Sequence, residues 1–110
     1  QNAIRDILND SQPVSVTVER IINEVSRYFE VSPQDIRSMD RTANVSLARQ
    51  AAVYIIREIT HMSMASIGEE FSNRDHSTIV YTIKQTKATM GSNTQYKNTI
   101  EDIIKNIRDQ

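Results

Sequence analysis

Apolar residues recur with helical spacing along most of the chain. The clearest stripe follows the spacing i, i+3, i+4, i+7 and i+11 and comprises Val18, Ile21, Ile22, Val25 and Phe29. This spacing places all of them on one face of a helix, which would be buried. Thr17 precedes the stripe and is the predicted N-cap.

The same reading predicts three more helices around this one. A short helix spans Ser32 to Ser38, with serine as its cap and proline in its first turn. A loop follows from Met39 to Val45. A long helix from Ser46 to Thr60 has a wide Ala/Ile face and is the expected core helix, and a last helix runs from Thr94 to Arg108.

Between the long helix and the last one lies a pair of helices joined by a tight turn. Ser63 can cap a short helix that ends at Phe71, and a polar break at Ser72-Asn73 follows. Asp75 can cap a longer helix that runs to about Met90 and ends at Gly91-Ser92-Asn93. This order is typical of a helix-turn-helix, whose second helix puts its first side chains into the DNA major groove.

Composition favours one folded, all-helical domain. The chain has 110 residues, 38% hydrophobic and 25% charged, which fits a single globular domain. The lack of cysteine excludes disulfides and thiolate metal sites. No apolar run approaches the ~18 residues of a membrane span, and no signal peptide is present. Two glycines and two prolines leave little material for hairpins.

Charge gives a mixed indication of a nucleic-acid partner. The net charge is −1, which is low for a DNA-binding domain. Residues 41–87 carry six basic and four acidic side chains, whereas the rest of the chain carries seven and ten. Positive charge is therefore mildly concentrated around the proposed turn, although chance scatter on solvated faces would also explain this difference.

The first turn of the second motif helix holds the candidate chemistry. Asp75 can be a structural cap, and at a helix tip its carboxylate can also accept from cytosine N4. His76, Ser77 and Thr78 can read bases or phosphates, or be ordinary surface residues. A metal or catalytic role is not expected, because the other histidine, His61, is distant and no acidic pair has ligand spacing. The helix face opposite the Ile79/Val80/Ile83 stripe is uncharged and comprises Thr78, Tyr81, Thr82, Gln85 and Thr89.

The motif also carries a family resemblance. Residues 71–80, FSNRDHSTIV, resemble the signature F-G-G-R-D-H-[ST]-T-V of the C-terminal DNA-binding domain (domain IV) of the bacterial chromosomal replication initiators, the DnaA family. Tyr28-Phe29, Arg49-Gln50 and Ser63-Met64 match upstream with the right order and spacing. The resemblance covers about residues 17–107 and implies an all-α, Trp-repressor-like helix-turn-helix domain over residues 17–110. It would bind an A·T-rich double-stranded origin element in the initiation and regulation of DNA replication.

The resemblance also assigns roles to single residues. Arg41 would enter the minor groove, Arg49 with Gln50 would contact the backbone, and Arg57 would contact a phosphate. Ser63 and Met64 would abut the backbone at the start of the first motif helix. The full implied DNA-binding set is Arg41, Arg49, Gln50, Arg57, Ser63, Met64, Arg74, Asp75, His76, Ser77 and Thr78.

The resemblance implies no catalysis and no cofactor in this domain. ATP would bind an upstream ATPase domain, to which residues 1–16, with a short helix from Asn2 to Leu8, would connect; the initial Gln suggests an excised fragment. The full-length protein would self-assemble on DNA in the cytoplasm, at the nucleoid, and the isolated domain would be monomeric.

The sequence departs from the family pattern at the DNA side. The loop before the long helix has one arginine, Arg41, beside Asp40, where a Lys/Arg cluster is usual. Ala48 occupies a position where the family usually has a proline, and Ser72-Asn73 replaces the usual glycine pair. An alternative function is therefore a protein-interaction module, a diverged paralogue with weak or no DNA binding. A nuclease or phosphotransferase is not expected, because no second carboxylate cluster or nucleophile accompanies Asp75 and His76.

Overall fold

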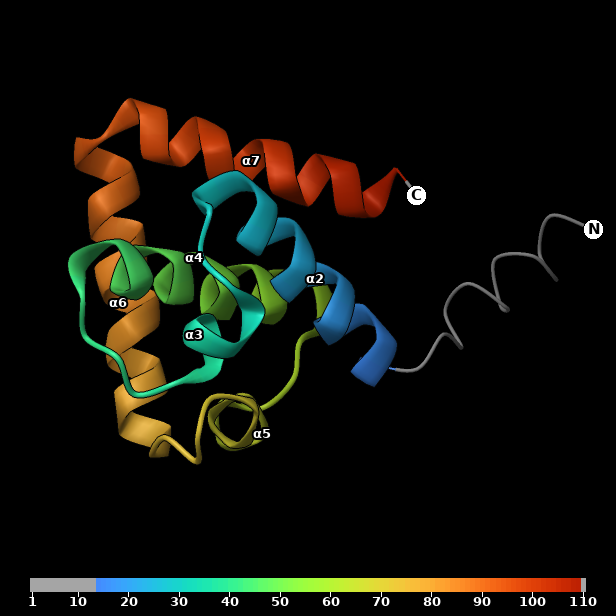
Figure 1. The fold of residues 1–110 in the computed structure, drawn as a ribbon, viewed down its shortest axis with the longest axis vertical. Helices are drawn as coiled ribbons and strands as arrows, with labels where there is room; N and C mark the ends of the chain where they lie inside the picture. Colours follow the sequence, from blue (N-terminus) through green and yellow to red (C-terminus); the bar gives the residue numbers. More distant parts are fainter. Residues whose placement is uncertain (1–13, 110) are drawn as a thin grey trace, which may run out of the picture.

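The computed structural model describes residues 14–109, which fold into helices joined by short connections (Figure 1). The helices are α2 (Val14–Phe29), α3 (Pro33–Arg37), α4 (Ala43–Thr60), α5 (Met64–Glu70), α6 (His76–Ser92) and α7 (Thr94–Arg108). No strand occurs within the described residues. The all-α prediction is therefore confirmed, while the expected helix from Asn2 to Leu8 lies outside the described residues.

Helix α4 is the centre of the domain. It packs against α2, α3, α5, α6 and α7, and Figure 1 shows it enclosed, with α7 across the top, α6 along the left and α5 at the bottom. Ala48, Ala51 and Ala52 are fully buried, and their small side chains let neighbouring helices approach closely. Ile55 and Ile56 are also fully buried, each contributing about 1.5–3 kcal/mol.

Three predicted caps are confirmed by hydrogen bonds to backbone amides. Ser32 Oγ accepts from the Asp35 amide at 3.1 Å and begins α3. Ser63 Oγ accepts from the amide of the third helical residue of α5 at 3.1 Å. Asp75 accepts from the Ser77 amide at 3.2 Å and begins α6. Each polar residue satisfies an amide that the helix leaves without a partner.

Other boundaries differ from the prediction. Helix α2 begins at Val14, so the predicted N-cap at Thr17 is wrong and this residue lies inside the helix. Helix α4 begins at Ala43 rather than Ser46, with Thr42 at its N-cap position. The loop that was predicted to reach Val45 therefore ends at Thr42. Gly91 has no positive φ and stays helical, so α6 continues to Ser92 and Asn93 alone separates it from α7.

Candidate nucleic-acid interface

The turn between α5 and α6 is held by a close backbone approach at Gly68. The Gly68 carbonyl accepts from the Phe71 amide at 3.0 Å and from the Arg74 amide at 2.9 Å. A Cβ on Gly68 would lie 2.1 Å from the Arg74 carbonyl oxygen, closer than any side chain tolerates. Glycine at this position therefore allows the tight crossing of the two motif helices.

The two residues at the corner of this turn adopt left-handed backbone conformations. Ser72 has φ 63° and Asn73 has φ 55°, a region that favours glycine and that asparagine tolerates better than most residues. Ser72 Oγ also donates to the Arg37 carbonyl at 2.6 Å. The turn thus keeps its shape without the glycine pair, with one hydrogen bond to α3 as partial compensation.

The tip of α6 presents polar side chains from a rigid first turn. The Asp75 carboxylate accepts from both the amide and the hydroxyl of Ser77. These hydrogen bonds, the hydroxyl's first, lower the pKa of Asp75, so this cap is ionised at neutral pH. His76, Ser77 and Thr78 are all exposed. The geometry leaves three hydrogen-bonding side chains directed away from the core at one helix end.

The exposed side of α6 continues this surface, but it is not uncharged as the sequence predicted, because Lys84 and Lys87 are exposed on it along with Tyr81 and Gln85. Thr82 Oγ1 donates to the Thr78 carbonyl at 2.8 Å, and Thr89 Oγ1 donates to the Gln85 carbonyl at 3.0 Å. Tyr81 is 62% exposed, and it follows Thr78 by three residues, so the two share a face. Because helical side chains lean toward the N-terminus, the tyrosine ring covers the surface beside the tip.

The loop of residues 38–42 carries Arg41 and is fixed by its own hydrogen bonds. The Asp40 carboxylate accepts from the Thr42 amide at 2.7 Å and from the Thr42 hydroxyl at 2.5 Å. These bonds lower the pKa of Asp40. The Asp40 amide in turn donates to Ser38 Oγ at 3.1 Å. Arg41 is exposed between Asp40 and Thr42, and it makes no hydrogen bond to another residue of the range 14–109.

Two other arginines of the predicted set bond backbone carbonyls inside the domain. Arg49 is only 6% exposed; its Nε donates to the Ile36 carbonyl at 2.8 Å and its Nη2 to the Asp35 carbonyl at 3.0 Å. Arg74 Nη2 donates to the Ser38 carbonyl at 2.8 Å. Burial, and then the charge of a neighbouring arginine, lower the pKa of both guanidinium groups.

The remaining predicted residues lie along α4 and at the start of α5. Arg57 donates to the Met62 carbonyl beyond the end of α4, next to the exposed cap Ser63. Met64 is half-buried and packs against the core. Gln50 is half-buried, and its carbonyl accepts from the buried Thr86 hydroxyl at 3.2 Å.

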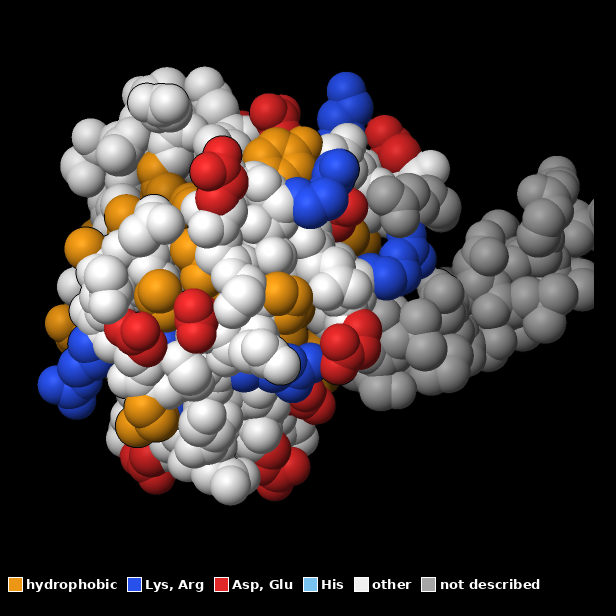
Figure 2. Space-filling view, in the orientation of Figure 1, with side chains coloured by type: hydrophobic (Ala, Val, Ile, Leu, Met, Phe, Trp, Pro, Cys, Tyr) orange, Lys and Arg blue, Asp and Glu red, His pale blue; other side chains and the backbone are white. Residues whose placement is uncertain are grey.

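The structure brings several residues of the predicted set together in two groups. One group lies at the turn, where the charges of Arg41, Arg49 and Arg74 act on one another. The other group lies at the connection between α4 and α5 and includes Arg57 and Ser63. Figure 2 shows acidic and basic side chains interspersed over the face that it draws, with no large area of one charge.

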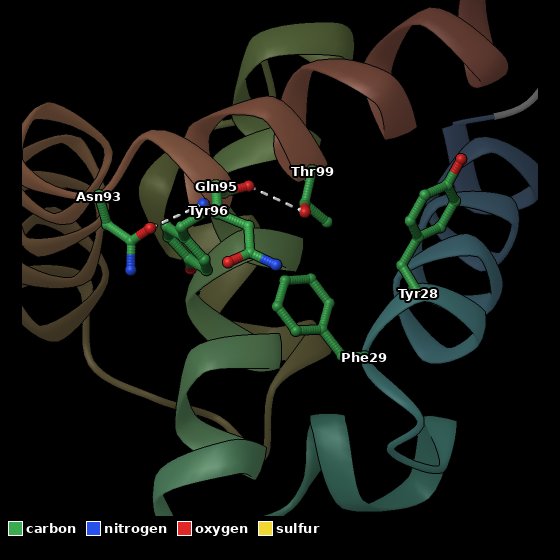
Figure 3. Close-up of a pocket in the computed structure, with 6 residues that line it drawn as sticks. All are labelled: Tyr28, Phe29, Asn93, Gln95, Tyr96 and Thr99. Atoms are coloured by element: carbon green, nitrogen blue, oxygen red, sulfur yellow. Dashed lines mark hydrogen bonds between the residues drawn. The ribbon is translucent and has the colours of Figure 1, made fainter.

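A shallow pocket of about 260 Å³ lies at the other end of α6, between α2 and α7 (Figure 3). Phe29 and Tyr96 meet edge to face, with ring centroids 5.9 Å apart, and the Tyr96 hydroxyl donates to the Leu47 carbonyl at 2.9 Å. With a rise of about 1.5 Å per residue, the length of α6 separates this pocket from the tip by roughly 25 Å. The pocket is therefore not part of the candidate interface.

Within residues 14–109 there is no group of three or more His, Asp or Glu side chains placed to hold a metal ion. None of the helices in that range combines the length and the apolar character needed to cross a bilayer.

Comparisons with known proteins point to one family. A family model described as the bacterial dnaA protein helix-turn-helix matches residues 18–86. The chromosomal replication initiator protein DnaA of Cutibacterium acnes is 34% identical over 105 residues, which are 96% of this chain and 21% of that protein. A crystal structure of a DNA replication initiation factor matches with a TM-score of 0.77 and 25% identity, covering 87% of this chain and 29% of the other. The chain thus spans less than a third of these relatives.

Proposed function

This chain belongs to the bacterial DnaA helix-turn-helix family, a family of non-catalytic DNA-binding domains, and from that premise we propose that it binds initiator boxes in double-stranded DNA at the replication origin. The observation that carries the proposal is the tip of α6. It presents His76, Ser77 and Thr78 to solvent on a first turn that Asp75 and the Gly68 crossing hold in place. Such a tip fits the major groove, where base edges differ most.

The tip combines side chains that can bond to bases with the positive electrostatic potential of a helix N-terminus, which attracts DNA. The helix N-terminus carries a partial positive charge, which favours the negative potential of the groove and its flanking phosphates. The imidazole of His76 and the hydroxyl of Thr78 can donate to or accept from base edges, and the Ser77 hydroxyl, whose proton is donated to Asp75, can accept from them. The capped carboxylate of Asp75 has further acceptor capacity for a cytosine amino group. The ring of Tyr81 would lie along the groove wall beside them.

Arg41 is the proposed minor-groove contact. It is exposed on an anchored loop, and arginine suits the narrow, strongly negative minor groove of A·T-rich DNA. On the other side of the motif, Arg57, Ser63 and Met64 would lie along the sugar-phosphate backbone, as would the side chain of Gln50. These contacts would set the register of the domain on the duplex, while the tip reads the bases.

The small number of cations at the candidate interface predicts weak binding by one copy. Phosphate contacts supply most of the sequence-independent affinity, and the net charge of the chain is −1. We therefore propose that the isolated domain is a monomer and that stable occupancy of the chromosome, in the cytoplasm, comes from several copies of the full-length protein on neighbouring sites. The same scarcity of free arginines supports the alternative function, a protein-interaction module that retains the fold.

A titration with matched variants separates these functions. Fluorescence anisotropy would compare an origin-like duplex with a scrambled one at low and moderate salt. Replacing His76 or Ser77 with alanine is expected to reduce the preference for the origin-like duplex by about 1–3 kcal/mol per contact, with little loss on the scrambled one. Gln95→Ala, in the first turn of α7 and beyond the far end of α6, is the control and should match the wild type. Equal losses on both duplexes would refute base reading by this tip, and absence of binding at low salt would favour the alternative function.

A further inference from the structure

The end of the short helix α3 is held by side chains from outside it. The last turn of a helix leaves carbonyl groups without partners, and here four successive carbonyls, of residues 35–38, are all satisfied. Arg49 bonds the first two, at 3.0 and 2.8 Å. Ser72 bonds the third at 2.6 Å and Arg74 bonds the fourth at 2.8 Å. We call these three side chains the carbonyl clamp.

The clamp joins two parts of the candidate interface that are distant in sequence. Ser72 and Arg74 belong to the turn of the helix-turn-helix, whereas Arg49 belongs to α4. The carbonyls they hold lead directly into the loop of residues 38–42. In that loop, Asp40 bonds Ser38 on one side and Thr42 on the other, which continues the hydrogen bonds up to the start of α4, and Arg41 lies between Asp40 and Thr42. Any shift of the clamp would therefore move Arg41 relative to the tip of α6.

We propose that Arg49 is a positioning residue for DNA recognition: it fixes the loop that presents Arg41 to the minor groove and does not itself contact a phosphate. The proposal rests on the DNA-binding function proposed above and adds the division of labour among its arginines. The tip of α6 binds in the major groove, and Arg41 binds in the minor groove. The carbonyl clamp sets the distance and the angle between the tip of α6 and Arg41.

The geometry of Arg49 separates this role from a phosphate contact. Two of its nitrogens already donate to protein carbonyls, and the residue is almost fully buried. The planar fork of a guanidinium can reach two successive carbonyls at once, whereas a lysine ammonium is a single point charge on a flexible stem. A phosphate contact would tolerate lysine in place of arginine, but the clamp would not.

The test measures minor-groove reading and salt dependence in the same variants. The probe is a duplex selected by the wild-type domain from a random pool, and copies in which adenine is replaced by 2,6-diaminopurine. This base adds an amino group to the minor groove while the major-groove edge stays closely similar. The wild type is expected to discriminate against the modified positions by roughly tenfold, and Arg41→Ala should abolish this discrimination and so mark the positions read in the minor groove.

Three variants then probe the clamp at a temperature where circular dichroism shows them folded. Arg49→Lys and Arg49→Gln should both lose the discrimination at the positions marked by Arg41→Ala, and the slope of log K against log salt should stay at the wild-type value. Ser72→Ala, which changes no charge, should reduce the same discrimination, and it carries the test if the Arg49 variants fail to fold. Arg27→Gln, which removes an arginine with a 69% exposed side chain on α2, controls for charge and should resemble the wild type.

A double-mutant cycle gives the decisive comparison. If Arg49 acts through the loop, adding Arg49→Gln to Arg41→Ala should cause little further loss of affinity, because both changes remove the same contact. Additive losses, a slope reduced by about 0.9 in Arg49→Gln and wild-type discrimination in Arg49→Lys would identify a phosphate contact and overturn the inference. Failure of the wild type to bind any duplex at low salt would instead reject the proposed function, and the inference with it.

Discussion

Replacing Gly68 with alanine tests whether the crossing of α5 and α6 depends on a missing side chain. The new Cβ would lie 2.1 Å from the Arg74 carbonyl oxygen and 3.2 Å from its carbon. These atoms are backbone and cannot rotate away, so the turn would have to move by about 1 Å, a form of overpacking that typically costs 1–3 kcal/mol. The movement would also weaken the hydrogen bond from the Arg74 amide to the Gly68 carbonyl, worth roughly 1 kcal/mol.

The higher helix propensity of alanine stabilises the variant, and this gain must be subtracted from the cost of overpacking. Alanine is favoured over glycine inside a helix by about 1 kcal/mol, so the net destabilisation for Gly68→Ala is about 1–3 kcal/mol. For a domain of this size, that lowers the melting temperature by roughly 5–20 °C. The chain contains a matched control, because Gly91 is also helical and a Cβ built there meets nothing within 4 Å. Gly91→Ala should therefore raise the melting temperature by a few degrees.

The assay is thermal unfolding of both variants, followed by circular dichroism, with the anisotropy titration as a second measurement. Gly68→Ala should also weaken discrimination between duplexes, since its turn carries Ser72 and Arg74. Gly91→Ala should leave DNA binding unchanged. The reasoning is refuted if the two variants shift the melting temperature in the same direction, because only a close approach at Gly68 separates them.

Two further predictions concern the turn and the tip of α6. Asn73 has φ 55°, so Asn73→Gly should stabilise the domain by up to about 1 kcal/mol in chemical denaturation, and a clear loss of stability would contradict the left-handed conformation. The Asp75 pKa is lowered chiefly by Ser77, so Ser77→Ala should raise it toward the ordinary value in an NMR carboxyl titration; an unchanged pKa would refute the bond. Because the pKa of Asp75 is lower in the folded protein, its contribution to the free energy of unfolding is complete above about pH 4. This contribution is lost as the pH falls through the lowered pKa.

The sequence was sufficient to predict the elements and the motif, because periodicity and caps are local signals. The stripe beginning at Val18 and the caps at Ser32, Ser63 and Asp75 each depend on residues within one helical turn. The helix-turn-helix followed from the order of two such elements and the break between them. The failures were also local: Thr17 has the chemistry of a cap, but the preceding residues extend the helix past it.

The backbone strain of the turn was beyond sequence reasoning. Glycine signals a left-handed or closely approached position, and Gly68 fits that rule through its contact with Arg74. Ser72 carries no such signal, and Asn73 carries only the weaker one of a residue that tolerates the left-handed region better than most. Their left-handed conformations result from the tertiary requirement that α6 cross α5 closely, which overrides the intrinsic preference of serine. The hydrogen bond from Ser72 to α3 also joins residues 35 positions apart.

The roles of the arginines show why site residues are harder to predict than helices. An arginine that binds phosphate and an arginine that caps a helix end use the same planar donors, so Arg41 and Arg49 look equivalent in the sequence. Tertiary structure distinguishes them: one is exposed on a loop, and the other is 6% exposed with two nitrogens bonded to carbonyls. Since the net charge is already −1, removing Arg49 and Arg74 from the phosphate-binding set leaves very few cations for the backbone. In the proposed complex, specificity then depends on how accurately the tip of α6 and Arg41 are held, one for each groove, more than on the total positive charge that the domain presents.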